Sequence, residues 1–324
     1  MAVTYLNRSA KGVYPIAITP FDQEGSVDLQ SLDRLIDFYL SCNVPGLTIL
    51  GVLGEVSRLS DSESIELTRH VIDRVNGRVQ VIVGVSHVGR QNFVAFTRSV
   101  MQAGAAGIMV APAVGLKTEE QVIRFFDGLI DSIGGDVPIA LQDYPQNTGV
   151  FISTQTLDVL IQRHPSIKVV KHEEASALNK ITRLRDQETK GSRERVSILV
   201  GNSALYLPQE LHRGADGANT GVAFPEMLVE VCDLFDKGQS QKGEDLYDLF
   251  LPLIRYEQQP GIGLAIRKEI FRRRGIIECA SVRAPGPKLN HHDHHELTAL
   301  LNRLQTKLTD SPFSQLIRSY PVKS

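Results

Sequence analysis

The stretch that decides the fold is Ile167-Lys168-Val169-Val170-Lys171-His172-Glu173-Glu174. Its first half is apolar and β-branched, which predicts a short buried strand. The strand ends in a lysine that is followed by three more ionisable residues. Because strand side chains alternate between two faces, Lys171 and Glu173 should point to one face and His172 to the other. We therefore expect Lys171 and Glu173 to share one space at the end of this strand.

Short apolar strands alternate with helical patterns on both sides of this stretch. The expected strands cover residues 12–18, 47–50, 79–83, 108–110, 139–141, 167–171, 198–200 and 217–220. Strict alternation predicts a parallel sheet with the helices outside, and eight strands are the number that closes a (β/α)8 TIM barrel. A doubly wound open sheet is the alternative, which is weakened because no glycine-rich phosphate loop follows the first strand. The predicted fold class is α/β, a (β/α)8 TIM barrel with a C-terminal helical appendage.

The pattern divides the chain into two parts. Residues 12–224 are predicted to form the catalytic barrel, and residues 225–310 a C-terminal helical region, because only helices are expected after Pro225. The last of these helices is expected over residues 297–307. Residues 1–11 are polar and are expected to be a loose lead-in.

Composition excludes several classes of function. A net charge of −2 gives neither a nucleic-acid footprint nor a basic membrane surface. The sequence contains no run of 18 apolar residues, the length that a membrane-spanning helix needs. The three cysteines are far apart, which favours reduced thiols in a cytoplasmic enzyme over a disulfide framework. We expect a soluble cytoplasmic protein with no nucleic-acid or membrane partner.

Lys171 and Glu173 are the first candidates for chemistry. In such a barrel the active site lies at the C-terminal ends of the strands. An enclosed lysine loses its proton more easily than an exposed one, and a neutral amine can attack a carbonyl. A structural ion pair between Lys171 and Glu173 is the alternative. The strand alone leaves both interpretations open.

Four segments occur together in order: Ile18-Thr19-Pro20-Phe21, Gly51-Val52-Leu53-Gly54-Glu55, a lysine ending the sixth strand, and Gly214-Ala215-Asp216-Gly217. This ordered set resembles the dihydrodipicolinate synthase / N-acetylneuraminate lyase family of Schiff-base aldolases, over roughly residues 12–275. The resemblance implies that Lys171 forms a Schiff base with a small 2-keto acid. It also implies a homotetramer, and no metal or nucleotide cofactor.

The chain departs from the synthase branch of that family. The synthases carry hydroxyls where this chain has Val52 and Leu53, a tyrosine where it has Gln142, and an arginine where it has Asn147. They also lend an aromatic hydroxyl from a neighbouring subunit at a position that is here Ala113-Val114. Valine has no proton to transfer, and an amide is not an acid or base near neutral pH. The synthase reaction is therefore not expected.

What remains is similar to the 2-keto-3-deoxy-sugar-acid dehydratases, in particular those that act on 2-keto-3-deoxyarabonate. The shared features are Gln142-Asp143-Tyr144-Pro145, Glu173, His87, Asn179-Lys180, Thr220-Gly221 and the helix start at residues 261–265. By this resemblance the chain is a lyase that dehydrates a 2-keto-3-deoxy sugar acid. A retro-aldol lyase that releases pyruvate and an inactive barrel that senses a keto acid are the alternatives.

The candidate catalytic residues are Lys171, Glu173 and Gln142. The candidate substrate-binding residues lie at strand ends: Gly51, Val52, Leu53, Gly54, His87, Tyr144, Gly201, Asn202, Asn219 and Thr220. We expect the substrate carboxylate on backbone N–H groups of the 51–54 loop, because its side chains offer nothing polar. His172 is expected to be hydrogen-bonded behind the barrel wall. The cluster at residues 291–295, His-His-Asp-His-His, is expected between helices and not as a metal site.

Overall fold

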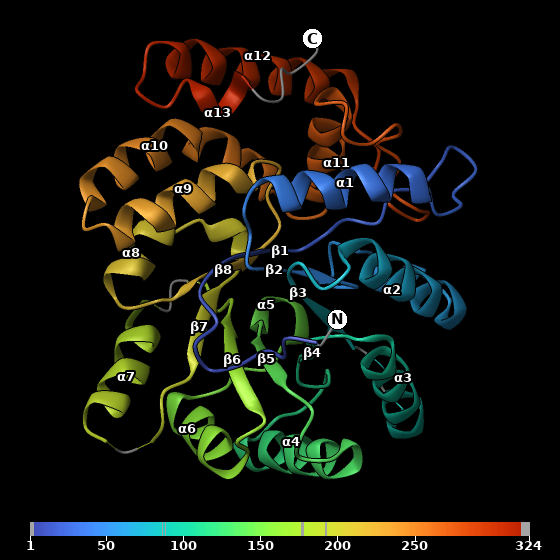
Figure 1. Ribbon diagram of the computed structural model, residues 1–324, viewed down its shortest axis with the longest axis vertical. Coiled ribbons are helices and arrows are strands. Elements are labelled where there is room, and N and C mark those ends of the chain that lie inside the picture. Colours follow the sequence, from blue (N-terminus) through green and yellow to red (C-terminus); the bar gives the residue numbers. More distant parts are fainter. Residues whose placement is uncertain (1–2, 86, 88, 176–177, 192, 319–324) are drawn as a thin grey trace.

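The computed structural model describes residues 3–85, 87, 89–175, 178–191 and 193–318. Eight parallel strands form one sheet in the order β1-β8-β7-β6-β5-β4-β3-β2. A bridge between Ile16 and Thr48 joins the two ends of this order, so the sheet is a nearly closed barrel with helices outside it (Figure 1). The predicted (β/α)8 barrel is confirmed. The strands are β1 Gly12–Pro15, β2 Gly46–Ile49, β3 Gln80–Gly84, β4 Gly107–Val110, β5 Ile139–Asp143, β6 Ile167–His172, β7 Ser197–Val200 and β8 Gly217–Thr220.

Local signals set the starts of the barrel helices. Asp28 caps the helix after β1, and Ser60 and Thr118 form capping boxes before two others. The helices are α1 Leu29–Ser41, η1 Val56–Arg58, α2 Asp61–Val75, α3 Arg90–Ala103, α4 Glu119–Ile133, α5 Pro145–Thr148, α6 Thr154–Arg163, α7 Leu178–Thr189, η2 Asn202–Ala204, α8 Leu207–His212, α9 Pro225–Asp236, α10 Ser240–Glu257, α11 Gly263–Arg273, α12 His291–Thr309 and α13 Gln315–Arg318.

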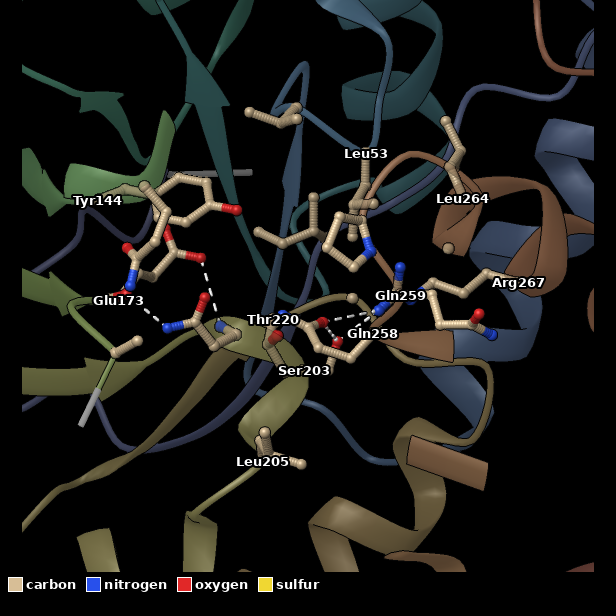
Figure 2. A pocket seen from close by; sticks show the side chains of 18 of the residues that line it. Leu53, Tyr144, Glu173, Ser203, Leu205, Thr220, Gln258, Gln259, Leu264 and Arg267 are labelled. Carbon is tan, nitrogen blue, oxygen red and sulfur yellow. Dashed lines mark hydrogen bonds between the residues drawn. The ribbon is translucent and has the colours of Figure 1, made fainter. Parts of the chain in front are cut away.

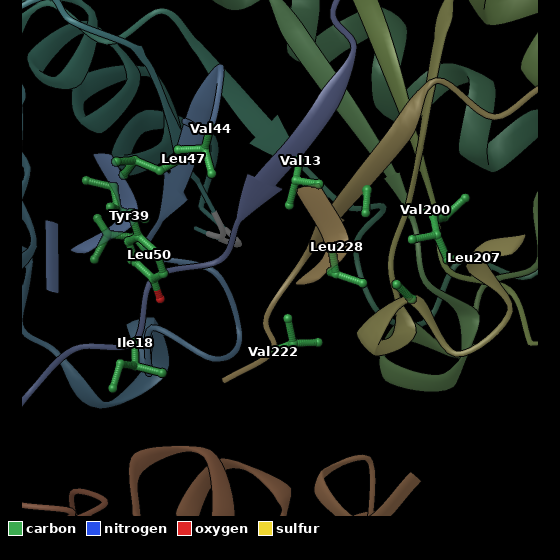
Figure 3. Packing of buried hydrophobic residues seen from close by; sticks show 14 of the residues in the cluster. Val13, Ile18, Tyr39, Val44, Leu47, Leu50, Val200, Leu207, Val222 and Leu228 are labelled. Atoms are coloured by element: carbon green, nitrogen blue, oxygen red, sulfur yellow. The ribbon is translucent and has the colours of Figure 1, made fainter. Parts of the chain in front are cut away.

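Two hydrophobic clusters occupy the two sides of the barrel wall. The smaller lies inside the barrel and includes Tyr14, Met109 and Val169. The larger lies between the strands and helices and includes Val170 (Figure 3 shows part of it). Val169 and Val170 thus face opposite sides of β6, which confirms the alternation predicted for this strand.

The N-terminal segment is not the loose lead-in that was expected. Leu6 and Ala10 are buried in the cluster inside the barrel. The backbone N–H of Leu6 donates to the carbonyl of Ala106 at 2.9 Å, and Ser197 Oγ donates to the carbonyl of Ala10 at 2.7 Å. This segment therefore closes the N-terminal end of the barrel, opposite the expected active site.

The C-terminal helices pack on the barrel. α9 lies against β1, α10 packs on α9, and α11 and α12 both contact α10; Figure 1 shows α12 above α10. The larger hydrophobic cluster runs without interruption from Val13 in β1 to Leu308 in α12. The predicted division after residue 224 would remove α9, the helix that follows the eighth strand, from the barrel. That division remains a prediction.

The histidine cluster lies inside a helix, so its expected position between helices is wrong. α12 begins at His291, because Asn290 caps it and forms a capping box with Asp293. Among the described residues, no group of three or more His, Cys, Asp or Glu side chains is placed to hold a metal ion. No helix within the described residues combines the length and the apolar composition needed to cross a membrane.

Candidate active site

A cavity of about 700 Å³ lies at the C-terminal ends of the barrel strands. Its wall combines strand ends, the loops that follow β2 and β7, and the start of α11. The described residues that line it include Ile16, Val52, Leu53, Glu55, Arg58, Gln142, Tyr144, Gln146, Lys171, Glu173, Glu174, Asn202, Ser203, Tyr206, Glu210, Thr220, Gly221, Gln258, Gln259, Leu264 and Arg267.

Lys171, Glu173 and Gln142 meet in the wall of this cavity. Lys171 pairs in register with Gln142 of the neighbouring strand β5. Lys171 Nζ lies 3.1 Å from Glu173 Oε2, and Gln142 Nε2 donates to the same oxygen at 2.5 Å. Lys171 is only 4% exposed and Glu173 only 7%. The three candidate catalytic residues thus form one buried group, joined by an ion pair and a hydrogen bond, in which a proton can pass between the amine and the carboxylate.

The loop after β7 fixes the Glu173 carboxylate from the other side. A Cβ added at Gly201 would lie 2.1–2.4 Å from the Cγ, Cδ and Oε1 atoms of Glu173, so a larger residue would displace the carboxylate. The N–H of Asn202 donates to Glu173 Oε1 at 3.4 Å, and the Asn202 amide donates to the Glu173 carbonyl. Asn202, Ser203 and Ala204 all have left-handed φ angles, of 49°, 55° and 56°. Such strain tends to occur at functional sites.

Tyr144 lines the cavity on the same side as Glu173, as Figure 2 shows. Burial raises the pKa of Tyr144, and the nearby Glu173 carboxylate adds to the rise, while the Arg267 guanidinium opposes it. The phenol is therefore protonated near neutral pH and can donate a hydrogen bond to a bound oxygen.

The loop after β2 offers backbone groups and apolar side chains. Val52 and Leu53 line the cavity, while Gly51 and Gly54 do not appear among its described lining residues. The N–H of Gly54 donates to the Gly51 carbonyl at 3.0 Å, and that of Glu55 to the Val52 carbonyl at 3.1 Å. The amides of Val52 and Leu53 are therefore the ones left for a substrate carboxylate.

Only some of the other candidate substrate-binding residues line the cavity. Thr220 lines the cavity, but Asn219 is fully buried in the barrel and donates to Thr48 Oγ1 at 2.9 Å. His87 is not among the described lining residues, since its Nε2 lies 3.7 Å from Asp61 Oδ1 and its ring packs on Phe96.

His172 lies behind the wall, as predicted, but the hydrogen bond expected there is not found at Nδ1. This atom is buried 3.6 Å from Asp143 Oδ2 and has no hydrogen-bond partner among the described residues. The same Asp143 oxygen accepts from Lys180 Nζ at 2.5 Å, so the aspartate is already paired. The resemblance had pointed to Lys180, and the structure gives it this scaffold contact.

A family model described as the dihydrodipicolinate synthetase family matches residues 9–304 of this sequence. The chain belongs to the dihydrodipicolinate synthetase family. Its members are lyases and synthases that act on small molecules.

Individual members of the dihydrodipicolinate synthetase family differ in activity. An L-2-keto-3-deoxyarabonate dehydratase of Azospirillum brasilense is 31% identical over 301 residues, covering 91% of this chain and 94% of the relative. A 4-hydroxy-tetrahydrodipicolinate synthase of Caldicellulosiruptor saccharolyticus is 32% identical over 248 residues, covering 76% and 81%. A crystal structure described as dihydrodipicolinate synthase from Rhodopseudomonas palustris superposes with a TM-score of 0.90 at 41% identity, covering 92% of this chain and 99% of that one.

The ionisable residues of the cavity wall that sequence reasoning missed in this family member include Arg267 and Glu210. Arg267 of α11 is 4% exposed. Glu210 of α8 is also buried, and burial raises its pKa to about 8. The only sequence signal for Arg267 is a run of three charged residues between the apolar positions Ile266 and Ile270 of one helix. Glu210 gave no such signal, because its burial depends on contacts that only the fold creates.

Proposed function

We propose that this chain is a lysine-dependent lyase that dehydrates a 2-keto-3-deoxy sugar acid. The observation that carries the proposal is the buried group of Lys171, Glu173 and Gln142, in which the amine lies 3.1 Å from the carboxylate. It joins a nucleophile and a proton carrier at the wall of a cavity large enough for a sugar acid.

The chemistry begins at Lys171. Its neutral amine adds to the C2 carbonyl, and one water leaves as the imine forms. The protonated imine draws electrons from C3, so Glu173 can remove a C3 proton and leave an enamine. The enamine then expels the C4 hydroxyl, which leaves with a proton as a second water. Hydrolysis of the imine consumes one water, restores Lys171 and releases a product that has lost one water overall.

The other candidate residues position the substrate. The C1 carboxylate binds the N–H groups of Val52 and Leu53, which lie on the cavity wall. Tyr144 and Thr220 supply hydroxyls for the oxygens further along the chain. The dehydratase of Azospirillum brasilense supports the reaction, and the lack of hydroxyls at Val52 and Leu53 counts against the synthase activity of other relatives.

Two further features are proposed from the family resemblance. We expect a homotetramer in the cytoplasm. The exposed side chains of Val114 and Phe151, 78% and 69% exposed, are apolar surface of the kind that subunit contacts cover. Light scattering on the purified chain tests the assembly.

Product analysis with a panel of 2-keto-3-deoxy acids tests the reaction. We expect a keto acid that has lost one water from at least one substrate, with no pyruvate. Pyruvate and an aldehyde in equal amounts would instead establish the retro-aldol reaction, which uses the same imine. No product from any acid, with no adduct on Lys171, would favour a sensor. For the condensation of pyruvate with aspartate semialdehyde, kcat/KM should stay well below about 10⁴ M⁻¹s⁻¹, where the ordinary range of enzymes begins.

A further inference from the structure

A buried guanidinium faces the cavity at a distance from the reacting amine. Arg267 lines the cavity from α11 and is 4% exposed. In Figure 2, Glu173 and Tyr144 lie on one side of the cavity, Arg267 lies on the other, and Thr220 lies between them. Lys171 is in contact with Glu173, so one cavity joins the amine on that side to Arg267 on the other.

The positive charge of Arg267 is poorly compensated. Its closest carboxylate, Glu257 Oε2, lies 3.9 Å from Nε, beyond hydrogen-bond distance. The Nε atom is buried without a hydrogen-bond partner among the described residues. Only Nη2 donates hydrogen bonds within the described chain, to the uncharged Ser203 Oγ and Gln258 Oε1.

The neighbouring residue on α11 shows what full compensation looks like. Lys268 is completely buried, and its Nζ donates to Glu55 Oε1 at 2.5 Å and to the carbonyl of Ser281 at 2.8 Å. Burial also raises the pKa of Glu257 to about 7, so the carboxylate that lies 3.9 Å from Arg267 is partly neutral at neutral pH. A buried charge without a close partner is unfavourable. An anionic ligand would remove that cost for Arg267.

The surroundings of Arg267 hold the guanidinium in place. Ser203 donates to Gln258 Oε1 while it accepts from Arg267, so the three side chains form a closed set of hydrogen bonds. A Cβ at Gly263 would lie 2.3 Å from the Glu257 carbonyl and 3.1 Å from Arg267 Nη1, so the helix start packs tightly against the arginine. Ser203 adopts a left-handed φ of 55°. The strained loop therefore places a neutral donor and acceptor against one edge of the guanidinium.

We propose that Arg267, held by Ser203 and Gln258, binds a carboxylate at the far end of the substrate. The preferred substrate is then a 2-keto diacid, with C1 near Val52 and Leu53, C2 on Lys171 and the second carboxylate on Arg267. A guanidinium binds a carboxylate through two parallel hydrogen bonds, which a terminal hydroxyl cannot reproduce. This inference rests on the proposed function, because Lys171 has to hold the keto end.

Matched keto acids test the inference on the wild-type chain. The pairs are 2-oxoglutarate with 2-oxovalerate and 2-oxoadipate with 2-oxohexanoate, which differ only in a terminal carboxylate or methyl group. The measurement is the concentration that gives half-maximal borohydride trapping on Lys171. In at least one pair we expect the diacid to trap at about tenfold lower concentration or less, as a charge-assisted contact predicts. Equal concentrations in both pairs, or a preference for the monoacids, would overturn the inference.

Substitutions assign the preference to one residue. Arg267→Gln should remove most of the diacid preference and leave pyruvate trapping within about threefold, because pyruvate has no distal group. Arg267→Lys should retain part of the preference. Arg272→Gln is the matched control, since Arg272 lies on the same helix but pairs with Glu269 outside the cavity wall. A wild-type diacid preference that Arg267→Gln leaves intact would place the anion site elsewhere.

Pyruvate separates this inference from the proposed function. If pyruvate traps on Lys171 in the wild type but the diacids have no advantage, only the role of Arg267 fails. If wild-type Lys171 traps no keto acid, the proposed function itself fails. Loss of pyruvate trapping in a folded Arg267→Gln variant would mean that Arg267 binds the C1 carboxylate, which contradicts the inference.

Discussion

The adjacent residues Glu173 and Glu174 have different partners and therefore different roles. Glu173 lies in the cavity wall, where Lys171 and Gln142 both contact its Oε2. Glu174 pairs with Lys180, 2.8 Å away, which also binds Asp143 behind the wall. Glu174 also lines the cavity, but its carboxylate contacts Lys180 and not Lys171. Glu173 is therefore placed for proton transfer, and Glu174 for holding the scaffold.

Replacing Glu173 should separate imine formation from elimination. Glu173→Gln keeps the size of the side chain but cannot exchange a proton, so dehydration should fall by about 10²–10⁴-fold. The substitution leaves the amine of Lys171 in place, so borohydride trapping should persist. Trapping and dehydration rate are measured on the same preparation. Glu174→Gln, the matched control, should stay within about threefold of wild type. Dehydration by Glu173→Gln at near the wild-type rate would leave Glu173 as a counter-ion only.

Substitution of Gly201, which packs against Glu173, gives a second test. In Gly201→Ala the new Cβ would lie 2.1–2.4 Å from three Glu173 atoms, so the carboxylate has to move away from Lys171. We expect dehydration to fall by about tenfold or more while imine trapping persists. Gly135→Ala, whose Cβ would meet nothing within 4 Å, should leave both unchanged. The role given to Gly201 is wrong if the two alanine variants have the same kcat.

The sequence predicted the part of the site that lies on one strand. Lys171 and Glu173 could be paired because alternation along β6 is a local property, and the structure brings them together. The tight approach of Gly201 to Glu173 and the position of Arg267 depend on contacts between distant segments. Arg267 contacts Ser203, which lies 64 residues away along the chain. No local pattern encodes such a pairing.

At the scale of elements, the alternation of apolar and polar residues predicted most of the barrel. The expected strands at 108–110 and 217–220 agree with β4 and β8. The N-terminal segment was missed because its apolar residues Leu6 and Ala10 are buried by the barrel interior and not by a partner nearby in sequence. The start of α12 was missed although Asn290 and Asp293 carry a capping-box signal.

The start of α2 predicts a specific dependence of stability on pH. Glu63 accepts from Arg283, 2.6 Å away, and from the N–H of Ser60 at 2.8 Å, and these bonds lower its pKa to about 2. A carboxylate with a lowered pKa stabilises the folded state fully above pH 4.5 and loses that effect as the pH falls through about 2.

Glu63→Gln should therefore flatten the fall in the free energy of unfolding across this acidic window. Urea unfolding at a series of pH values measures it. Glu66→Gln is the control on the same helix, because Glu66 is exposed and forms no ion pair among the described residues. If Glu63→Gln follows the wild-type curve, the link between α2 and Arg283 does not stabilise the fold.

At the scale of the whole molecule, the barrel and the C-terminal helices share one core. The larger cluster contains Val13 of β1, Leu228 of α9 and Leu308 of α12. Lys268 of α11 also forms a buried ion pair with Glu55 of the loop after β2. These contacts imply that the C-terminal helices complete the cavity and stabilise the barrel.

A chain that ends after residue 224 should consequently not fold on its own. It would lack α9 and would expose the apolar side of β1, against which α9 packs. Circular dichroism and urea titration should show no cooperative transition for this fragment. A chain that ends after residue 318, which keeps every described C-terminal helix, should unfold like the full chain. A cooperative transition of the 224-residue fragment would instead support an independent barrel domain.

The measurement that tests the account most directly is borohydride reduction in the presence of pyruvate, followed by peptide mapping. Lys171 is a buried amine in a cavity wall, 3.1 Å from its carboxylate partner. We expect a single reduced pyruvate adduct on Lys171 and none in Lys171→Arg, because a guanidinium does not form the imine. An adduct on Lys168 or Lys180, or no adduct with any keto acid, would contradict this expectation.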